Sequence, residues 1–174
     1  GVPSNATLVF IPNVSGVGGS GVYPVLNSGD NGEAKGITIF GGAMLTIGGG
    51  KNLNVGNALS IADGGKLIAS DGTNLSTIKI GGQLSNAGKF VHGGSSTVEW
   101  TSASSYDIAM NGDTLYNFTV SNKPGSTITF SMKRGESLVV ENNFTIGGGT
   151  VDCKQGTLVV RGNFIKESGA TFAH

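Results

Sequence analysis

The chain is short of charge. Only 13% of its 174 residues are Asp, Glu, Lys or Arg, about half the usual share, and its 11 acidic and 11 basic side chains cancel. A surface that binds nucleic acid needs an excess of Lys and Arg to neutralise phosphates, so this composition argues against nucleic acid as a partner. The balance also leaves little long-range repulsion between copies of the chain.

Proline, cysteine and long apolar runs are scarce as well. Four prolines without a Gly-X-Y period exclude a collagen helix. A single cysteine, Cys153, cannot form a disulfide within the chain. No apolar run approaches the ~18 residues of a membrane-spanning helix, so we expect no membrane span. The hydrophobic share of 37% is nevertheless too high for an intrinsically disordered chain.

Glycine is abundant, at 31 positions, and with the many Ser, Thr and Asn residues it disfavours helices. The apolar residues instead form short alternating runs, for example at 7–11, 37–40 and 77–80. Alternation with β-branched residues predicts strands. Turn signals such as Asn111-Gly112 separate the runs and supply positive φ angles. The chain is therefore predicted to be all-β.

An internal repeat favours a solenoid over a sandwich or barrel. The segment SLVVENNF at 137–144 recurs as TLVVRGNF at 157–164, an offset of 20 residues. A unit this short cannot bury its own apolar face, but stacked units share one core. We therefore predict a right-handed parallel β-helix with coils of about 20 residues, in which about eight coils stack ~4.8 Å apart.

Stacking in register predicts which residues lie over one another. Aliphatic and aromatic pairs should form inward columns, and an asparagine pair should form an amide ladder at a turn. The expected pairs are Phe144 over Phe164, Leu138 over Leu158, Val140 over Val160 and Asn143 over Asn163. The chain is predicted to divide into residues 1–35, comprising an N-terminal strand, a Gly-rich linker and a first coil or cap, and residues 36–174, the solenoid body.

The same segments carry a resemblance to a known group. Residues 9–12, 22–26, 37–39 and 42–47 look like the opening of repetitive secreted surface proteins of Bacteroidota, which are typically exported by the type IX system. Residues 96–100 through 115–120 resemble the recurring "VTFNG…YNLTI" element of those proteins, although Tyr106-Asp107-Ile108 departs from it. The resemblance implies a β-helical stalk or scaffold, located outside the cell or on its surface.

The chain offers little catalytic chemistry. Its histidines are His92, in a Gly-flanked turn, and His174, the last residue. Together with Cys153 they would be the whole stock of nitrogen and sulfur ligands for zinc. We therefore predict no enzyme activity, no cofactor and no metal. A calcium site near Asp30 stays open, as does glycosylation at five sequons, namely Asn5, Asn13, Asn74, Asn117 and Asn143.

Two aromatic residues are candidates for a carbohydrate contact. Trp100 and Tyr106 could form part of an aromatic strip that binds surface glycans. The alternative role for the protein is accordingly a carbohydrate-binding or adhesin stalk module of a larger surface protein. A third interpretation is a small polysaccharide-active enzyme that uses acidic residues along a groove.

The ends of a solenoid expose unpaired backbone groups unless they are capped. No amphipathic helix occurs at either end of the sequence, and residues 169–174 still have the pattern of a coil. We therefore predict a fibre subunit that assembles head to tail with copies of itself, by stacking or by strand donation. The predicted assembly residues are Leu8, Val9, Phe10 and Ile11 at one end and Thr171 and Phe172 at the other.

Overall fold

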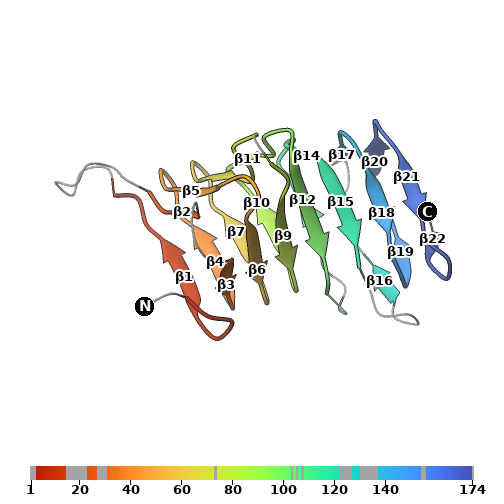
Figure 1. Ribbon diagram of the computed structural model, residues 1–174, viewed down its shortest axis with the longest axis horizontal. Helices are drawn as coiled ribbons and strands as arrows, with labels where there is room; N and C mark the ends of the chain where they lie inside the picture. The colour runs from red at the N-terminus through yellow and green to blue at the C-terminus, as the bar shows by residue number, and fades with distance from the viewer. Residues whose placement is uncertain are drawn as a thin grey trace.

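The computed structural model describes residues 3–14, 23–26, 31–72, 74–102, 104, 106, 108–121, 127–129, 137–153 and 156–173. Every regular element within these ranges is a β-strand, and the strands form five parallel sheets. The chain winds from β1 at one end of an elongated body to β22 at the other (Figure 1). The predicted parallel β-helix is confirmed.

The sheets, called I to V here, are made of the following strands. Sheet I holds β1 (Leu8–Ile11), β4 (Gly36–Ile39), β7 (Leu59–Ile61), β10 (Leu84–Asn86) and β13 (Ile108–Ala109). Sheet II holds β2 (Val25–Leu26), β5 (Met44–Ile47), β8 (Lys66–Ile68) and β11 (Lys89–Val91). Sheet III holds β3 (Gly32–Ala34), β6 (Asn52–Val55), β9 (Ser76–Ile80), β12 (Ser96–Trp100), β15 (Asn117–Val120), β18 (Phe144–Ile146) and β21 (Phe164–Lys166). Sheet IV holds β14 (Thr114–Leu115), β17 (Ser137–Val140) and β20 (Thr157–Val160), and sheet V holds β16 (Thr127–Thr129), β19 (Thr150–Asp152) and β22 (Thr171–Ala173).

Each turn of the solenoid contributes three strands. In every sheet, neighbouring strands differ by three in their order along the chain. Successive strands therefore occupy three places around the solenoid in a repeating cycle. In the second half of the body, sheet IV occupies the place of sheet II, and sheet V occupies the place of sheet I. Sheet III runs the whole length and holds the turns in one register.

The stacked pairs expected from the repeat are present. Phe144 pairs with Phe164, and β17 pairs with β20 so that Leu138 meets Leu158 and Val140 meets Val160. The amide of Asn163 donates to Oδ1 of Asn143 at 3.0 Å. The register predicted from the sequence is therefore correct in this part of the body.

The number of turns is smaller than expected. The seven strands of sheet III mark seven turns separated by six steps, rather than the expected number of about eight coils. The estimate failed because the spacing is uneven: Phe144 lies 20 residues before its partner Phe164 but 26 residues after its partner Phe118. Corner segments of different length account for the difference, since the paired strands themselves stay short.

Two inward columns of sheet III form the spine of the core. Alternate residues of each strand point inward because successive side chains of a strand point to opposite faces. The registers of the six strand pairs define the first column as Gly32, Leu53, Ile78, Val98, Phe118, Phe144 and Phe164. They define the second column as Ala34, Val55, Ile80, Trp100, Val120, Ile146 and Lys166.

Close stacking of the corners explains part of the glycine content. A Cβ placed on Gly88 would lie 2.3 Å from the carbonyl oxygen of Gly65 and 2.4 Å from that of Ala62. Because such distances are far below van der Waals contact, only glycine fits between these stacked turns. Asn111, with φ of 50°, is the non-glycine residue in the described ranges that adopts a left-handed conformation.

The N-terminal strand belongs to the first turn. β1 pairs with β4, β2 with β5 and β3 with β6, all in parallel. The strand expected at 7–11 therefore begins one residue later and lies on its own body. The division of the chain at residues 35 and 36 stays a prediction, and the linker at 15–21 lies outside the described residues.

Truncating a ring in the aromatic part of the first column tests the columnar core. Phe144 is fully buried, and its ring centroid lies 5.5 Å from that of Phe118. We expect Phe144→Ala to lower the free energy of unfolding by about 3–5 kcal/mol in urea denaturation. The matched control is Leu75→Ala, which removes an exposed side chain and should change it by less than about 0.5 kcal/mol. Equal losses in both variants would contradict the assignment of the core.

Candidate functional site

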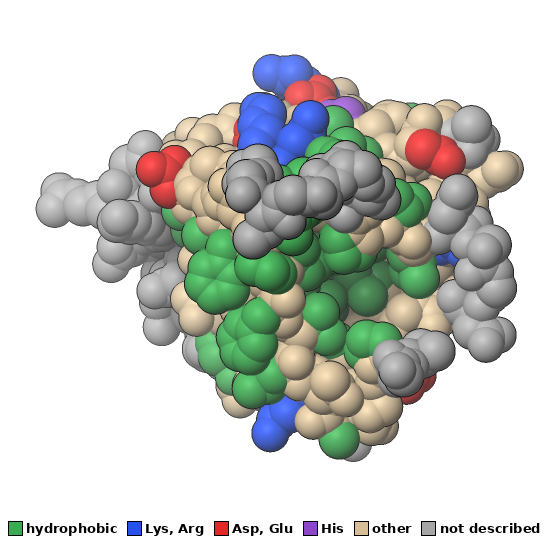
Figure 2. Space-filling view, turned by 90° about the vertical axis from the view of Figure 1, so that its left-hand side faces the viewer, with side chains coloured by type: hydrophobic (Ala, Val, Ile, Leu, Met, Phe, Trp, Pro, Cys, Tyr) green, Lys and Arg blue, Asp and Glu red, His purple; other side chains and the backbone are tan. Residues whose placement is uncertain are grey.

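The N-terminal end of the solenoid opens into an apolar hollow. Its volume is about 520 Å³, and aliphatic side chains of the first two turns line it, including Ile11, Ile37, Leu45 and Leu53. Figure 2 looks onto this end and shows hydrophobic side chains around the recess. The core is therefore accessible from this end.

The hollow results from small residues in the first turn. β3 places Gly32 and Ala34 in the two inward columns that carry larger apolar side chains in each of the next five turns. β2, the neighbouring strand, is only two residues long. The first turn therefore provides too little side-chain volume to close the end of the core.

The C-terminal end presents large side chains instead. Phe164, the last member of the first column, is 46% exposed, whereas its neighbours Phe144 and Phe118 are fully buried. Its ring contacts the ring of Phe172 at a centroid distance of 5.3 Å. Lys166 ends the second column, and its ammonium group donates to the carbonyl of Ala170 at 2.8 Å. An inward-pointing charge at an edge strand discourages unspecific edge pairing.

Exposed apolar side chains of the described ranges gather at these two ends. Leu8, Phe10, Val25 and Phe40 lie in the first two turns, and Val159, Phe164 and Ile165 lie in the last. Leu75 is the exception, in the middle of the body. Apolar surface concentrated in this way marks an interaction site more than isolated apolar residues do.

The predicted assembly residues lie at the edges of the solenoid. β1 carries Leu8 to Ile11 and is the first strand of sheet I, and β22 carries Thr171 and Phe172 and is the last strand of sheet V. Leu8 and Phe10 point outward and are exposed, whereas Ile11 is buried in the core. The structure brings the first four residues together at one end and the last two at the opposite end; it does not test their role in assembly.

The assignment of Trp100 as a sugar contact is wrong. Trp100 is only 2% exposed because it occupies the second inward column of sheet III. Its indole N–H donates to the carbonyl of Gly82 at 2.9 Å. An aromatic residue can stack on a sugar only if a face of its ring is accessible, so Trp100 is a core residue.

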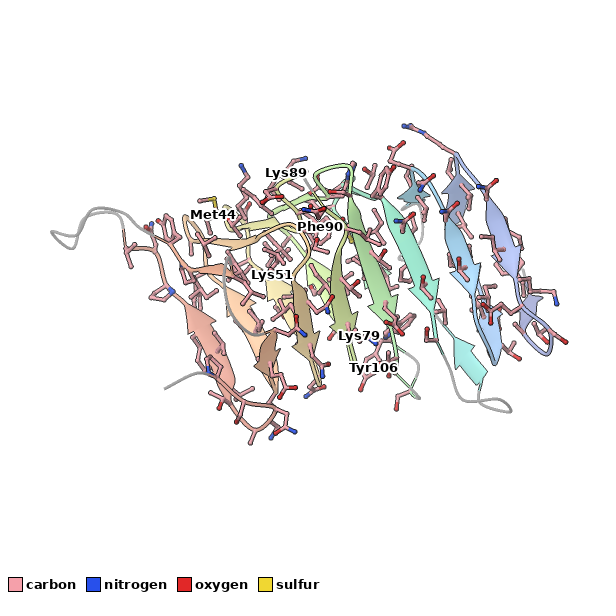
Figure 3. All side chains as sticks on the ribbon, viewed as in Figure 1. Met44, Lys51, Lys79, Lys89, Phe90 and Tyr106 are labelled. Atoms are coloured by element: carbon pink, nitrogen blue, oxygen red, sulfur yellow. The ribbon has the colours of Figure 1, made fainter. Side chains whose placement is uncertain are left out.

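Tyr106 and His92 lie outside that column. Tyr106 is half-buried against the edge of the core, and Figure 3 shows it near the side of the body. The ring of His92 stacks on that of Tyr116, with centroids 5.8 Å apart, and its Nδ1 accepts the N–H of Gly94. With Trp100 buried, Tyr106 is not part of an exposed strip of two aromatic residues.

A break between sheets II and IV holds a buried carboxylate, Asp113, whose burial the sequence does not predict. β11 ends sheet II, and β14, the next strand in the same place of the cycle, begins sheet IV. Asp113 directly precedes β14 and is 6% exposed. A pocket of about 240 Å³ opens beside it, with Lys89, Phe90 and His92 in its wall.

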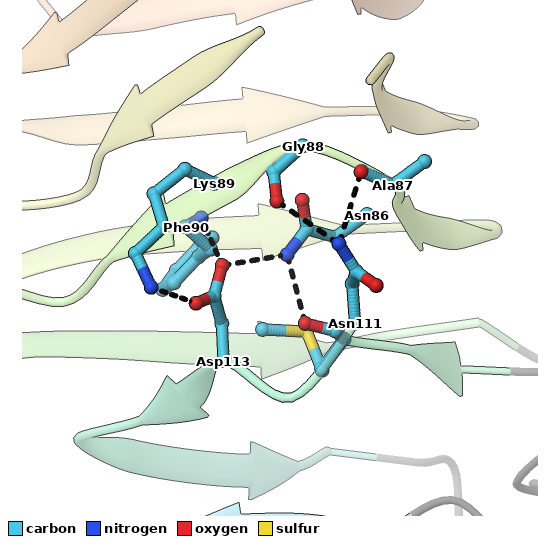
Figure 4. A network of polar contacts seen from close by, with 8 residues as sticks. Asn86, Ala87, Gly88, Lys89, Phe90, Asn111 and Asp113 are labelled. Atoms are coloured by element: carbon cyan, nitrogen blue, oxygen red, sulfur yellow. Dashed lines mark hydrogen bonds and ion pairs between the residues drawn. The ribbon is translucent and has the colours of Figure 1, made fainter. Parts of the chain in front are cut away.

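Both oxygens of Asp113 are engaged with the preceding turn (Figure 4). Oδ2 accepts the side-chain amide of Asn86 at 3.0 Å and the backbone N–H of Phe90, and Oδ1 accepts the ammonium group of Lys89. The Asn86 amide also donates to the carbonyl of Met110 at 3.0 Å. The side chain of Asp113 therefore accepts hydrogen bonds from the preceding turn at a place where β11 and β14 are not paired through their backbones.

The asparagine sequons divide into two groups. Asn5, Asn13 and Asn74 are exposed, whereas Asn117 and Asn143 are half-buried in a ladder on sheet III. Oδ1 of Asn117 accepts the Asn142 amide at 2.9 Å and the backbone N–H of Asn143 at 3.2 Å. Asn117 and Asn143 thus have structural roles at stacked turns. The calcium site considered near Asp30 lies outside the described residues, as does His174.

Metal and membrane sites receive no support from the geometry. Among the residues with described positions, no three His, Cys, Asp or Glu side chains are grouped so that they could hold a metal ion. In the same part of the chain, no helix is long and apolar enough to cross a membrane.

Comparison with known proteins adds no relative. No protein-family model, no curated protein and no solved structure matches the chain.

Removing the Asp113 carboxylate tests its role as a connector between turns. Asp113→Ala leaves the Phe90 N–H and the Asn86 amide without this acceptor, so we expect a loss of about 1–3 kcal/mol in unfolding free energy. The control is Lys89→Ala, which should cost less than about 1 kcal/mol because the Lys89 side chain is 63% exposed. Urea denaturation measures both; a larger cost for Lys89→Ala would contradict this ranking.

Cys153 offers a test of burial. Burial, followed by the nearby charge of Asp152, raises the pKa of the Cys153 thiol to about 11. Because the thiolate is the reactive form, we expect a disulfide reagent at pH 8 to modify the folded protein at least about tenfold more slowly than the protein in urea.

The raised pKa of Cys153 also predicts how stability depends on pH. The thiol of the unfolded chain loses its proton before that of the folded chain as the pH rises, so the free energy of unfolding should fall above pH 9. Cys153→Ser should remove that part of the fall, and a pH profile identical in both proteins would contradict the raised pKa.

Proposed function

We propose that the protein is a non-enzymatic structural protein, a β-solenoid subunit that assembles head to tail into a filament or matrix fibre outside the cell or on its surface. The observation that carries the proposal is the position of the exposed apolar side chains, which gather in the first two turns and in the last turn of the solenoid. The location rests on the resemblance to secreted surface proteins.

The two ends differ in a way that favours head-to-tail contact. The N-terminal end is hollow, with Gly32 and Ala34 in the inward columns, and the C-terminal end offers Phe164 and Phe172. A contact between unlike ends is heterologous, so it continues indefinitely unless a rotation closes it into a ring. Neutral net charge supports growth because it removes long-range repulsion between subunits.

A structural role also agrees with the state of the buried carboxylate. Asp113 uses both oxygens to hold adjacent turns together, as its contacts with Asn86, Lys89 and Phe90 describe. A general acid or base needs an oxygen that can face a substrate. Asp113 is therefore explained by the fold.

The second candidate is a stalk module of a larger surface protein. The open ends favour it as well, because further coils of a longer chain would cover the hollow as effectively as another copy. The burial of Trp100 removes one of the two residues on which carbohydrate binding rested. Monomers at every concentration would favour the stalk.

Charges introduced at either end should block filament growth. We expect Val25→Glu at the hollow and Phe164→Glu at the opposite end each to raise the critical concentration for assembly by about tenfold or more, or about 1.4 kcal/mol. Sedimentation with negative-stain electron microscopy measures this. Leu75→Glu introduces the same charge at an exposed leucine away from both ends and serves as the control. Unchanged assembly in both end variants would contradict end-to-end stacking.

A further inference from the structure

One hydrogen bond recurs at the corner that follows each strand of sheet III. The first residue after the strand donates its N–H to the carbonyl of the last residue of the preceding strand, at 2.8 to 3.0 Å. The donors and acceptors are Gly56 to Ala34, Gly81 to Val55, Thr101 to Ile80, Ser121 to Trp100, Gly147 to Val120 and Glu167 to Ile146. This hydrogen bond therefore forms wherever a strand of sheet III lies on the strand of a preceding turn.

In the first turn, the corresponding N–H donates to a different carbonyl. Lys35 follows β3, and no strand precedes β3 in sheet III. Its N–H donates instead to the carbonyl of Thr7, at 2.7 Å, directly before β1. Thr7 and β1 thus stand where the last turn of a preceding solenoid would stand.

Charges at this corner are complementary between the two ends. In the register of sheet III, the corner position is Lys35 in the first turn and Glu167 in the last. The five turns between them have uncharged residues there: Gly56, Gly81, Thr101, Ser121 and Gly147. If β21 of one copy continued sheet III onto β3 of the next, Glu167 and Lys35 would lie side by side.

The same register matches the inward side chains in size. It places Phe164, which ends the first column, over Gly32, and Lys166 over Ala34. The large Phe164 then meets the smallest inward residue of sheet III, and the Lys166 ammonium keeps the Ala170 carbonyl of its own turn as its acceptor within the joint. At the outward position next to Phe164, Asn163 would lie over Asn31. This would extend the ladder of side-chain hydrogen bonds in which the Asn163 amide already donates to Asn143.

β1 stands in the way when β21 of one copy pairs with β3 of the next. When β21 lies against β3 of the next copy, β22 reaches the place in the cycle that β1 of that copy occupies against β4. Only one of the two strands fits. Residues 12–24 separate β1 from β2 in the sequence, so β1 can leave β4 and stay connected to the rest of the chain.

We propose that β1 is a displaceable cap: β22 of a second copy of this chain takes its place against β4 while β21 of that copy pairs with β3, which brings Glu167 beside Lys35. Growth then requires release of β1, which in the free subunit occupies the place beside β4 that β22 of the second copy would take. The inference rests on the proposed head-to-tail assembly and specifies its partner, its register and its gate.

A disulfide that locks β1 tests the gate. Phe10 and Thr38 are partners across β1 and β4, and the ~4.8 Å spacing of paired strands suits a disulfide. In a Cys153→Ser background, Phe10→Cys with Thr38→Cys should prevent filaments when oxidised and permit them after reduction. The control, Lys79→Cys with Glu99→Cys, locks two interior partners that need not separate, so its oxidised form should assemble normally.

Exchanging the corner charges tests the register. Lys35→Glu and Glu167→Lys should each raise the critical concentration about two- to fivefold at low salt, and the double variant should restore it.

Three results would overturn the inference, and they are distinguishable. Normal growth with β1 locked would reject the cap and leave head-to-tail assembly standing. Additive losses in the double charge variant would reject the register alone. A wild-type chain that stays monomeric at every concentration would reject both the second copy as partner and the proposed function.

Discussion

The structure depends on one constraint: each turn must place its inward side chains directly over those of the previous turn. Parallel pairing at ~4.8 Å makes the backbone bonds between turns, and the core becomes a set of continuous columns. A large side chain in the middle of a column is fully buried because another turn lies on each side of it. Phe144 and Phe164 differ in exposure for this reason alone, since they share a column and a chemical type. The ends are consequently the places where the molecule can interact with more solenoid.

Sequence reasoning succeeded where the repeat was regular and failed where it was not. The pairs Phe144–Phe164 and Asn143–Asn163 followed from a 20-residue offset between nearly identical segments. The number of turns did not, because corner insertions change the spacing without changing the strands. Trp100 could have been placed correctly, since it alternates with the inward Val98 in β12. Asp113 could not, because its burial arises from a break between two sheets that only the three-dimensional register reveals.

Irregular positions carry the functional inferences. Asp113 accepts hydrogen bonds from the preceding turn where two sheets are not joined by strand pairing. Gly32 and Ala34 leave space in the core of the first turn. Thr7 supplies the carbonyl acceptor that a preceding turn would otherwise supply. Each one departs from the pattern of the surrounding columns. The two departures at the N-terminal end share one property: both leave room for, or imitate, a turn that belongs to another solenoid.

The axial repeat of the filament is the measurement that tests this account most directly. If β21 of one copy pairs with β3 of the next, each copy adds the seven strands of sheet III, and electron cryomicroscopy should give a rise of about 34 Å per subunit, seven spacings of ~4.8 Å. If β1 stays in place and β22 pairs with it, one extra spacing separates the copies, and the rise becomes about 38 Å. Filaments in which the solenoid axes lie across the fibre, or no filaments at all, would contradict the central claim that the open ends join.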